Sequence, residues 1–245
     1  MKADSSFVTA PPCNHLLVAL PVDALERLRP HLRRVRLEPG EILHDTGRTL
    51  VDAVFPATAI VSLLSVLQDG ASAQVAVIGN DGVVGAALFL GGDTMPNRAV
   101  VQSAGSGYRL NAALLMEEFR RAGALHDLLL RYTQALLTQM AQTAVCNRHH
   151  SVDQQLCRWL LLSLDRLPDN RLAMTQELIA SMLGVRREGV TEAAGRLQRA
   201  GSIAYRRGHI VIKNRAALEG MVCECYDLVR SEVTRLFPDR ARPKF

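Results

Sequence analysis

The sequence contains no apolar run close to the roughly 20 residues that a membrane-spanning helix needs. Its first residues include the acidic Asp4 and no extended apolar stretch, so the pattern of a signal peptide is missing too. We therefore expect a cytoplasmic protein with no membrane partner. Aromatic residues make up 4% of the chain and cysteines number five. An odd number of cysteines in 245 residues argues for free thiols instead of a disulfide framework.

Motifs of catalysis are missing as well. There is no glycine-rich phosphate loop, no metal-ligand helix and no nucleophile elbow, so we expect no enzyme and no catalytic residue. Cys223 and Cys225 are two apart in an expected C-terminal helix, where such residues do not share a face. Cys146 and Cys157 are most simply apolar fillers, although His149-His150 lies beside the former. The sequence therefore predicts no metal site.

Charge is unevenly distributed along the chain. Residues 1–150 carry 13 basic and 13 acidic side chains, whereas residues 151–245 carry 16 basic and 11 acidic ones. The whole net charge of +5 thus belongs to the second part, and residues 171–215 alone contain nine basic and three acidic residues. A neutral part followed by a basic part is typical of a regulatory domain joined to a nucleic-acid-binding domain.

The basic part contains the pattern of a helix-turn-helix. Thr175 can cap a short helix whose apolar residues recur at spacings of three and four. Gly184 allows a tight turn, and a second helix is expected from Arg186 to Ala200, ended by Gly201. Residues 203–213 then predict a β-hairpin that turns at Arg207-Gly208, which would form a wing.

The outward face of the second helix suggests contact with DNA. A recognition helix touches base edges with its N-terminal turns, so the expected base-reading residues are Arg187, Glu188, Thr191 and Glu192. The expected phosphate contacts are Thr175, Arg186, Arg196, Arg199, Arg206 and Arg207. Two helices around a glycine also occur in ordinary helical domains, and the basic hairpin is what favours DNA.

The first part of the chain predicts a small β-sandwich or barrel. Short apolar runs at 35–37, 53–56, 59–64, 74–78 and 98–102 alternate with turns such as Gln68-Asp69-Gly70. Short helices are expected at 21–28 and from the cap Asn111 to Phe119, and a long helix from Leu125 to Asn147.

The apolar surface of this long helix exceeds what one domain needs, so we expect a homodimer. The expected interface residues are Leu128, Tyr132, Ala135, Leu136 and Gln139. The alternative is one long helix packed on its own domain.

Nearly the whole chain resembles the CRP/FNR family of bacterial transcription regulators. The matching segments are Pro39-Gly40-Glu41, Ile78 to Gly85, and Gly184-Val185-Arg186-Arg187-Glu188-Gly189-Val190. The resemblance implies an α+β fold: a double-stranded β-roll of the cyclic-nucleotide-binding type, a long dimerisation helix and a winged helix-turn-helix. It also implies that Arg187 and Glu188 read bases. Glu192 stands where the family usually has an arginine, and Arg186 replaces a small capping residue, which implies an altered recognition code.

The resemblance gives little support for the usual effectors. Relatives that bind cyclic AMP hold it with a Gly-Glu-Leu segment and an arginine, and this chain has Ala86 after Gly85 in place of the glutamate. Gly85 and Arg98 remain as weak candidates for an effector site, although a solvated arginine is the simpler interpretation. Iron–sulfur relatives use clustered N-terminal cysteines, whereas only Cys13 lies near this start. We expect neither cyclic AMP nor an iron–sulfur cluster, and the cofactor stays unknown.

The expected organisation is a sensor domain at 1–123, a dimerisation helix at 124–148, the DNA-binding domain at 149–219 and a C-terminal helix and tail at 220–245. The leading hypothesis is a homodimeric regulator that binds double-stranded DNA with paired half-sites. RNA polymerase is a further expected partner if the regulator is an activator. The alternative is a small-ligand or cyclic-nucleotide receptor whose helical C-terminus contacts a protein. The sequence does not identify the effector, the operator or the target genes.

Overall fold

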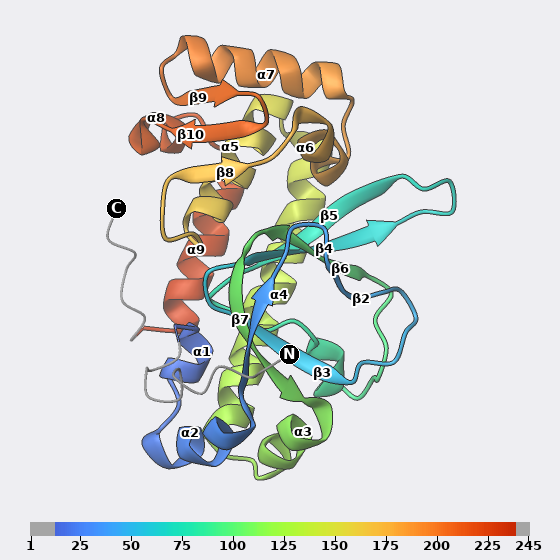
Figure 1. Cartoon of the computed structure of the whole chain (residues 1–245). Coiled ribbons are helices and arrows are strands. Elements are labelled where there is room, and N and C mark those ends of the chain that lie inside the picture. Colours follow the sequence, from blue (N-terminus) through green and yellow to red (C-terminus); the bar gives the residue numbers. More distant parts are fainter. Residues whose placement is uncertain (1–12, 239–245) are drawn as a thin grey trace.

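A computed structural model describes residues 13–238, and Figure 1 shows its parts along one long helix. A β-roll lies on one side of this helix, and a winged helix domain lies at its C-terminal end. The first twelve residues of the expected sensor domain and the last seven of the expected C-terminal segment lie outside the described residues. No helix in the described part is long and apolar enough to cross a bilayer.

The roll is preceded by three short helical turns and consists of two antiparallel sheets. The turns are α1 (His15–Val18), α2 (Val22–Leu28) and the 3-10 turn η2 (Arg29–His31). One sheet has the order β1-β7-β3 and the other β2-β6-β4-β5. The strands are β1 (Arg33–Leu37), β2 (Ile42–His44), β3 (Asp52–Pro56), β4 (Ile60–Val66), β5 (Ser72–Ile78), β6 (Arg98–Ser103) and β7 (Gly105–Asn111), with the 3-10 turn η3 (Ala86–Leu88) after β5.

The strands predicted from apolar runs are confirmed, and β2 and β7 are present in addition to them. β7 begins Gly-Ser-Gly and has no run of β-branched residues, so its pattern is that of a loop. Its glycines are required by close packing, because a Cβ at Gly105 would overlap the backbone nitrogen of Ala59. The strand therefore depends on its neighbours, with which it pairs on both sides as the centre of its sheet.

The long helix α4 (Ala124–His149) has 26 residues and follows α3 (Ala112–Arg120), which the Asn111 side chain caps as predicted. At 1.5 Å per residue α4 is about 39 Å long. One of its faces packs on the roll. The Tyr132 hydroxyl donates to the carbonyl oxygen of Val83 at 3.0 Å, and Gln139 Nε2 donates to that of Val77 at 3.1 Å.

This packing corrects the predicted dimer interface. Leu128, Tyr132, Ala135, Leu136 and Gln139 are 4–7% exposed because they are buried within their own protomer. A partner subunit cannot reach them. The face of α4 that remains open contains Leu130 (45% exposed), Leu137 (57%) and Val145 (46%). The periodicity of the helix correctly indicates a buried face, but the roll covers that face instead of a second subunit.

The C-terminal part is a three-helix domain with a small sheet, followed by two further helices. Its elements are α5 (Val152–Leu164), β8 (Arg171–Ala173), α6 (Gln176–Leu183), α7 (Arg187–Arg199), β9 (Ile203–Arg206), β10 (His209–Ile212), α8 (Arg215–Glu219) and α9 (Cys225–Leu236). Ser151 and Gln154 form a capping box at the start of α5. α9 returns and packs along α4, as Figure 1 shows.

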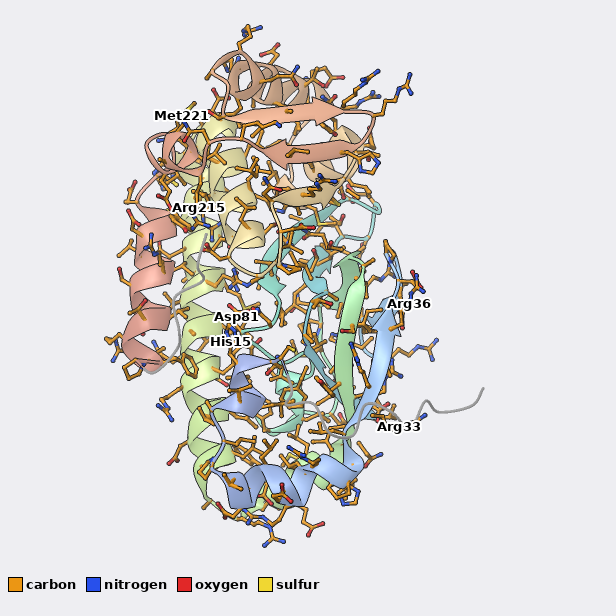
Figure 2. All side chains as sticks on the ribbon, turned by 60° about the vertical axis from the view of Figure 1, so that its left-hand side comes forward. His15, Arg33, Arg36, Asp81, Arg215 and Met221 are labelled. Atoms are coloured by element: carbon orange, nitrogen blue, oxygen red, sulfur yellow. The ribbon has the colours of Figure 1, made fainter. Side chains whose placement is uncertain are left out.

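The roll and the C-terminal part meet along β5, where the Ser72 and Ser181 hydroxyl oxygens are 2.8 Å apart, and at the turn between β5 and η3. Asp81 in this turn forms a salt bridge with Arg166, which follows α5; the Nη2–Oδ2 distance is 2.8 Å and both side chains are at most 10% exposed. A Cβ at Gly79 would lie 2.6 Å from Arg166 Cβ, and one at Gly82 equally close to the Tyr132 ring. Figure 2 shows Asp81 beside His15, close to α4. The segment from Ile78 to Gly85, which resembles the family motif, therefore contributes to the contact between the two domains.

Candidate nucleic-acid interface

The helix-turn-helix forms through the local signals expected from the sequence. Thr175 Oγ1 accepts a hydrogen bond from the Leu178 amide at 3.2 Å and so caps α6. Gly184 ends α6 with φ of 67°, a left-handed conformation that glycine adopts readily. The second helix, α7, has no side-chain cap because Arg186 occupies the N-cap position.

The inner face of α7 is buried and its outer face is open. Val190, Ala193, Ala194 and Leu197 are 0–4% exposed and pack against α5 and α6. On the outer face, Arg187 and Glu188 are exposed at the start of the helix, and Glu192 is exposed one turn after Glu188. The Arg187 side chain is 64% exposed and its Nε lies 3.8 Å from Glu177 Oε2, a contact that a polyanion can replace.

Thr191 differs from the other predicted base-reading residues. Its hydroxyl donates to Gln176 Oε1 at 2.7 Å, which links α7 to α6. The same oxygen lies 3.0 Å from the Arg187 carbonyl oxygen. Its donor is therefore engaged within the domain, and its role as a base reader is not supported by the geometry. Arg187, Glu188 and Glu192 remain available.

The wing is held beside the start of α6. Arg207 and Gly208 have φ values of 50° and 78°, as the two central residues of a type I′ turn require. The Met174 amide donates to the Gly208 carbonyl at 2.7 Å, and the Tyr205 hydroxyl donates to the Met174 carbonyl at 2.9 Å. An open cleft of about 560 Å³ lies between wing and helices; it is lined by Thr175, Gln176, Glu177, Arg187, Tyr205, Arg207 and Gly208.

Four of the predicted phosphate contacts are exposed cations. Within the described residues, no carboxylate oxygen is recorded within 4.0 Å of Arg186, Arg199, Arg206 or Arg207. They lie at the start of α7, at its end and at the wing tip, so they surround the turns predicted to read bases. Such an arrangement suits the phosphates on both sides of a groove.

Arg196 and Thr175 are already engaged. Asp153 of α5 accepts two hydrogen bonds from the Arg196 guanidinium, both of 2.7 Å, and this pairing raises the Arg196 pKa above its usual value. Arg196 therefore fastens α7 to α5, and the prediction that it contacts phosphate is not supported by this geometry. The Thr175 hydroxyl oxygen caps α6, which leaves only its proton for a phosphate.

The weak effector-site candidates lie in the roll. Gly85 has φ of 111°, and the following Ala86 is 4% exposed within the core. Arg98 Nε and Nη2 donate to the two carboxylate oxygens of Asp45 at 2.8 and 3.2 Å. The Arg98 guanidinium also holds the pKa of Asp45 below its usual value. Arg98 is thus paired with a carboxylate, which competes with any phosphate for it.

Four side chains meet where α4 ends, although the sequence predicted no metal site there. Cys146 and His150 come from the end of α4, and Cys223 and Cys225 from the turn before α9 and its first residue. The prediction that Cys223 and Cys225 face different sides is wrong, because Cys223 precedes the helix. The signal that sequence reasoning undervalued is the pair Cys146 and His150, four residues apart at the point where α4 ends.

The architecture defines a class: a β-roll joined by a long helix to a winged helix domain. Residues 154–221 match the family of the Crp-like helix-turn-helix domain. Among curated protein sequences, none matches this chain. The chain therefore contains a Crp-like helix-turn-helix domain, and the resemblance noted in its sequence is confirmed there.

Solved structures show the same fold over most of the chain. FixK2 from Bradyrhizobium japonicum has a TM-score of 0.65 at 18% identity, over 78% of this chain and 98% of its own. The c-di-GMP responsive global regulator CLP of Xanthomonas campestris has a TM-score of 0.63 at 18% identity, over 78% and 99%. A CRP-family transcriptional regulator from Thermus thermophilus has a TM-score of 0.62 at 19% identity, over 76% and 95%. The chain thus has the fold of CRP/FNR-family regulators.

Proposed function

We propose that this protein is a homodimeric, sequence-specific DNA-binding transcription regulator whose β-roll receives a signal. The observation that carries the proposal is the open N-terminal end of α7. There Arg187 and Glu188 stand in solvent while four exposed arginines flank them. Arginine donates two hydrogen bonds to guanine and glutamate accepts one from the cytosine amino group, so these two residues read adjacent base edges.

Glu192 is expected to change which bases the second helix recognises. Its side chain is 72% exposed, and its nearest described cation is Arg196 at 3.7 Å, which Asp153 already holds. A carboxylate there repels phosphate and accepts only from amino groups of cytosine or adenine. We therefore expect the half-site to differ from that of a regulator with arginine at this position.

The dimer uses the open face of α4. The exposed residues Leu130, Gln134, Leu137, Ala141 and Ala144 follow spacings of four, three, four and three. This 3.5-residue repeat is the one by which two parallel helices form a coiled coil. Its leucines, Leu130 and Leu137, are 45% and 57% exposed, and such apolar exposure supports a partner helix at this face.

The signal is not cyclic AMP bound in the usual manner. Ala86 offers no carboxylate to a ribose, and Asp45 already pairs with Arg98. These observations support an effector of other chemistry or a roll that responds through its contacts with α4.

Selection from random duplexes with the purified protein tests DNA binding. We expect an enriched, two-fold symmetric site whose affinity falls steeply with salt, with a log–log slope of about −0.9 per phosphate neutralised. Replacing both wing-tip arginines, Arg206→Ala with Arg207→Ala, should weaken all duplexes to a similar extent. The matched control Arg33→Ala lies on β1, away from the interface (Figure 2), and should change nothing.

If the protein is instead a receptor with a protein partner, we expect the opposite results in these two experiments. In that case no sequence is enriched, and the wing-tip variant binds duplexes as the native protein does. Loss of binding restricted to one sequence would contradict phosphate contact by the wing.

A further inference from the structure

The cluster at the end of α4 has the composition of a metal site. Its four ligand atoms, three thiol sulfurs and one imidazole nitrogen, all lie within 4.8 Å of one another. Cys146 Sγ is 3.6 Å from Cys223 Sγ, and Cys225 Sγ is 3.6 Å from His150 Nδ1. The three cysteines are 0–3% exposed. Residues 77 positions apart in sequence are thus brought to a single point.

These separations suit one tetrahedral ion. Zinc binds cysteine sulfur at about 2.3 Å and histidine nitrogen at about 2.0–2.1 Å, so the edges of its tetrahedron are about 3.8 Å between sulfurs and about 3.5 Å between sulfur and nitrogen. A disulfide would instead bring two sulfurs to about 2.05 Å. The sulfurs therefore lie at the spacing of a shared ion and not of a covalent bond.

The surroundings orient His150 as they would a ligand. Its Nε2 lies 3.4 Å from Glu224 Oε2, so a proton on Nε2 leaves the lone pair of Nδ1 directed at the cluster. Metal-binding histidines commonly donate their second nitrogen to a carboxylate in this way. Gln155 Nε2 donates to the His150 carbonyl oxygen at 2.9 Å and fixes its backbone.

A buried cation provides an independent observation. Arg158 of α5 is 6% exposed, and its recorded side-chain partner is the neutral Thr143 hydroxyl, at 3.0 Å from Nη2. Its Nε has no hydrogen-bond partner among the described residues. A buried guanidinium without a carboxylate is costly unless other negative charge is near. The three cysteines of the cluster lie near enough to interact electrostatically with Arg158, and as thiolates they would supply this charge.

We propose that Cys146, His150, Cys223 and Cys225 bind one zinc ion. Three thiolates and a neutral imidazole around Zn²⁺ carry a net charge of −1, which Arg158 balances. Binding releases three thiol protons to solvent and transfers no electrons. The set fills all four positions of the ion, which is the arrangement of a structural site without room for substrate.

The ion would fasten the junction between the two parts of the molecule. α4 ends at His149 and α5 begins at Val152, so His150 lies in the link that joins the long helix to the winged domain. Cys223 and Cys225 tie the chain that leaves this domain to the same point. Zinc occupancy therefore sets how firmly the winged domain is held on α4, and its effect on DNA affinity rests on the proposed function.

Metal content of the full-length protein, purified without a histidine tag under reducing conditions, tests the proposal. We expect about one zinc per chain. Cys223→Ser and Cys225→Ser should lose it, whereas the matched control Cys157→Ser, at an equally buried cysteine outside the cluster, should keep it. Since a variant can fail to fold, Co²⁺ added to the native apoprotein gives a second measurement. It should produce the intense visible bands of a tetrahedral thiolate site, which one equivalent of zinc abolishes.

Three results would overturn the proposal. They are a native protein that takes up neither zinc nor cobalt, a Cys225→Ser protein that retains full zinc, and iron with labile sulfide in place of zinc. Chelation should also lower the Tm of the native protein and leave that of Cys225→Ser unchanged. None of these readouts requires DNA, so failure of the metal site is distinguishable from failure of DNA binding.

Discussion

The salt bridge between Asp81 and Arg166 is one of the contacts by which the roll holds the winged domain, and breaking it should destabilise the protein strongly. The two side chains are 10% and 6% exposed and share contacts of 2.8 and 3.0 Å. Arg166→Met keeps the apolar stem and removes the charge. Asp81 then stays buried without its guanidinium, and it keeps a hydrogen bond from the Gly79 amide at 3.2 Å.

Removal of one partner from a buried ion pair costs about 3–5 kcal/mol, chiefly because the other charge loses its compensation. We expect about 3 kcal/mol for Arg166→Met, the lower end of this range, because Asp81 keeps a backbone donor. Asp81→Asn should cost a similar amount. The double variant should recover part of the loss, since neither charge of the pair remains, and the double-mutant cycle should give a coupling of about 1–3 kcal/mol.

Urea unfolding followed by tryptophan fluorescence measures these values. Trp159 is the single tryptophan, lies in α5 and is 5% exposed, so its emission reports the region next to Arg166. Arg36→Met is the control, because the Arg36 side chain is 82% exposed and points away from the roll (Figure 2). Its cost should stay below about 1 kcal/mol. Equal costs for Arg166→Met and Arg36→Met would refute the role of the buried pair.

Three further outcomes are expected. Arg187→Ala should cost about 1–3 kcal/mol on the selected operator and relax the preference at one base pair; an unchanged preference would contradict base reading. Leu137→Asp should yield monomers in sedimentation, whereas Leu228→Asp, a similarly exposed leucine on α9, should leave the dimer intact. Burial raises the pKa of Cys157 to about 12, so at pH 8 iodoacetamide should label exposed Cys13 far faster, as mass spectrometry of the native protein would show.

The helix-turn-helix was predictable because its signals are local. A threonine cap at Thr175, a glycine at Gly184 and the Arg207-Gly208 turn each act within a few residues, and the structure confirms all three. The recognition helix accordingly begins and ends within one residue of its predicted limits.

The features that were not predicted depend on contacts between residues that are distant in sequence. The apolar periodicity of α4 shows that a face is buried, but not whether the roll or a second subunit covers it. β7 exists because β1 and β3 pair with it. The meeting of Cys146 with Cys223 follows from the path of α9 back along α4, which no short pattern encodes. Likewise, the engagement of Arg196 by Asp153 is invisible in the composition of α7.

At the wing tip, the residue that gives the positive charge is not the one that gives the most stable backbone. Arg207 has φ of 50°, a left-handed conformation that costs a residue with a side chain about 1 kcal/mol and that asparagine tolerates better. Arg207→Asn should therefore make the hairpin more stable while it removes an exposed positive charge. A screen for thermal stability alone would select this substitution and discard a proposed DNA contact. If the proposed function holds, the strained arginine marks a position where a more stable protein would bind DNA less tightly.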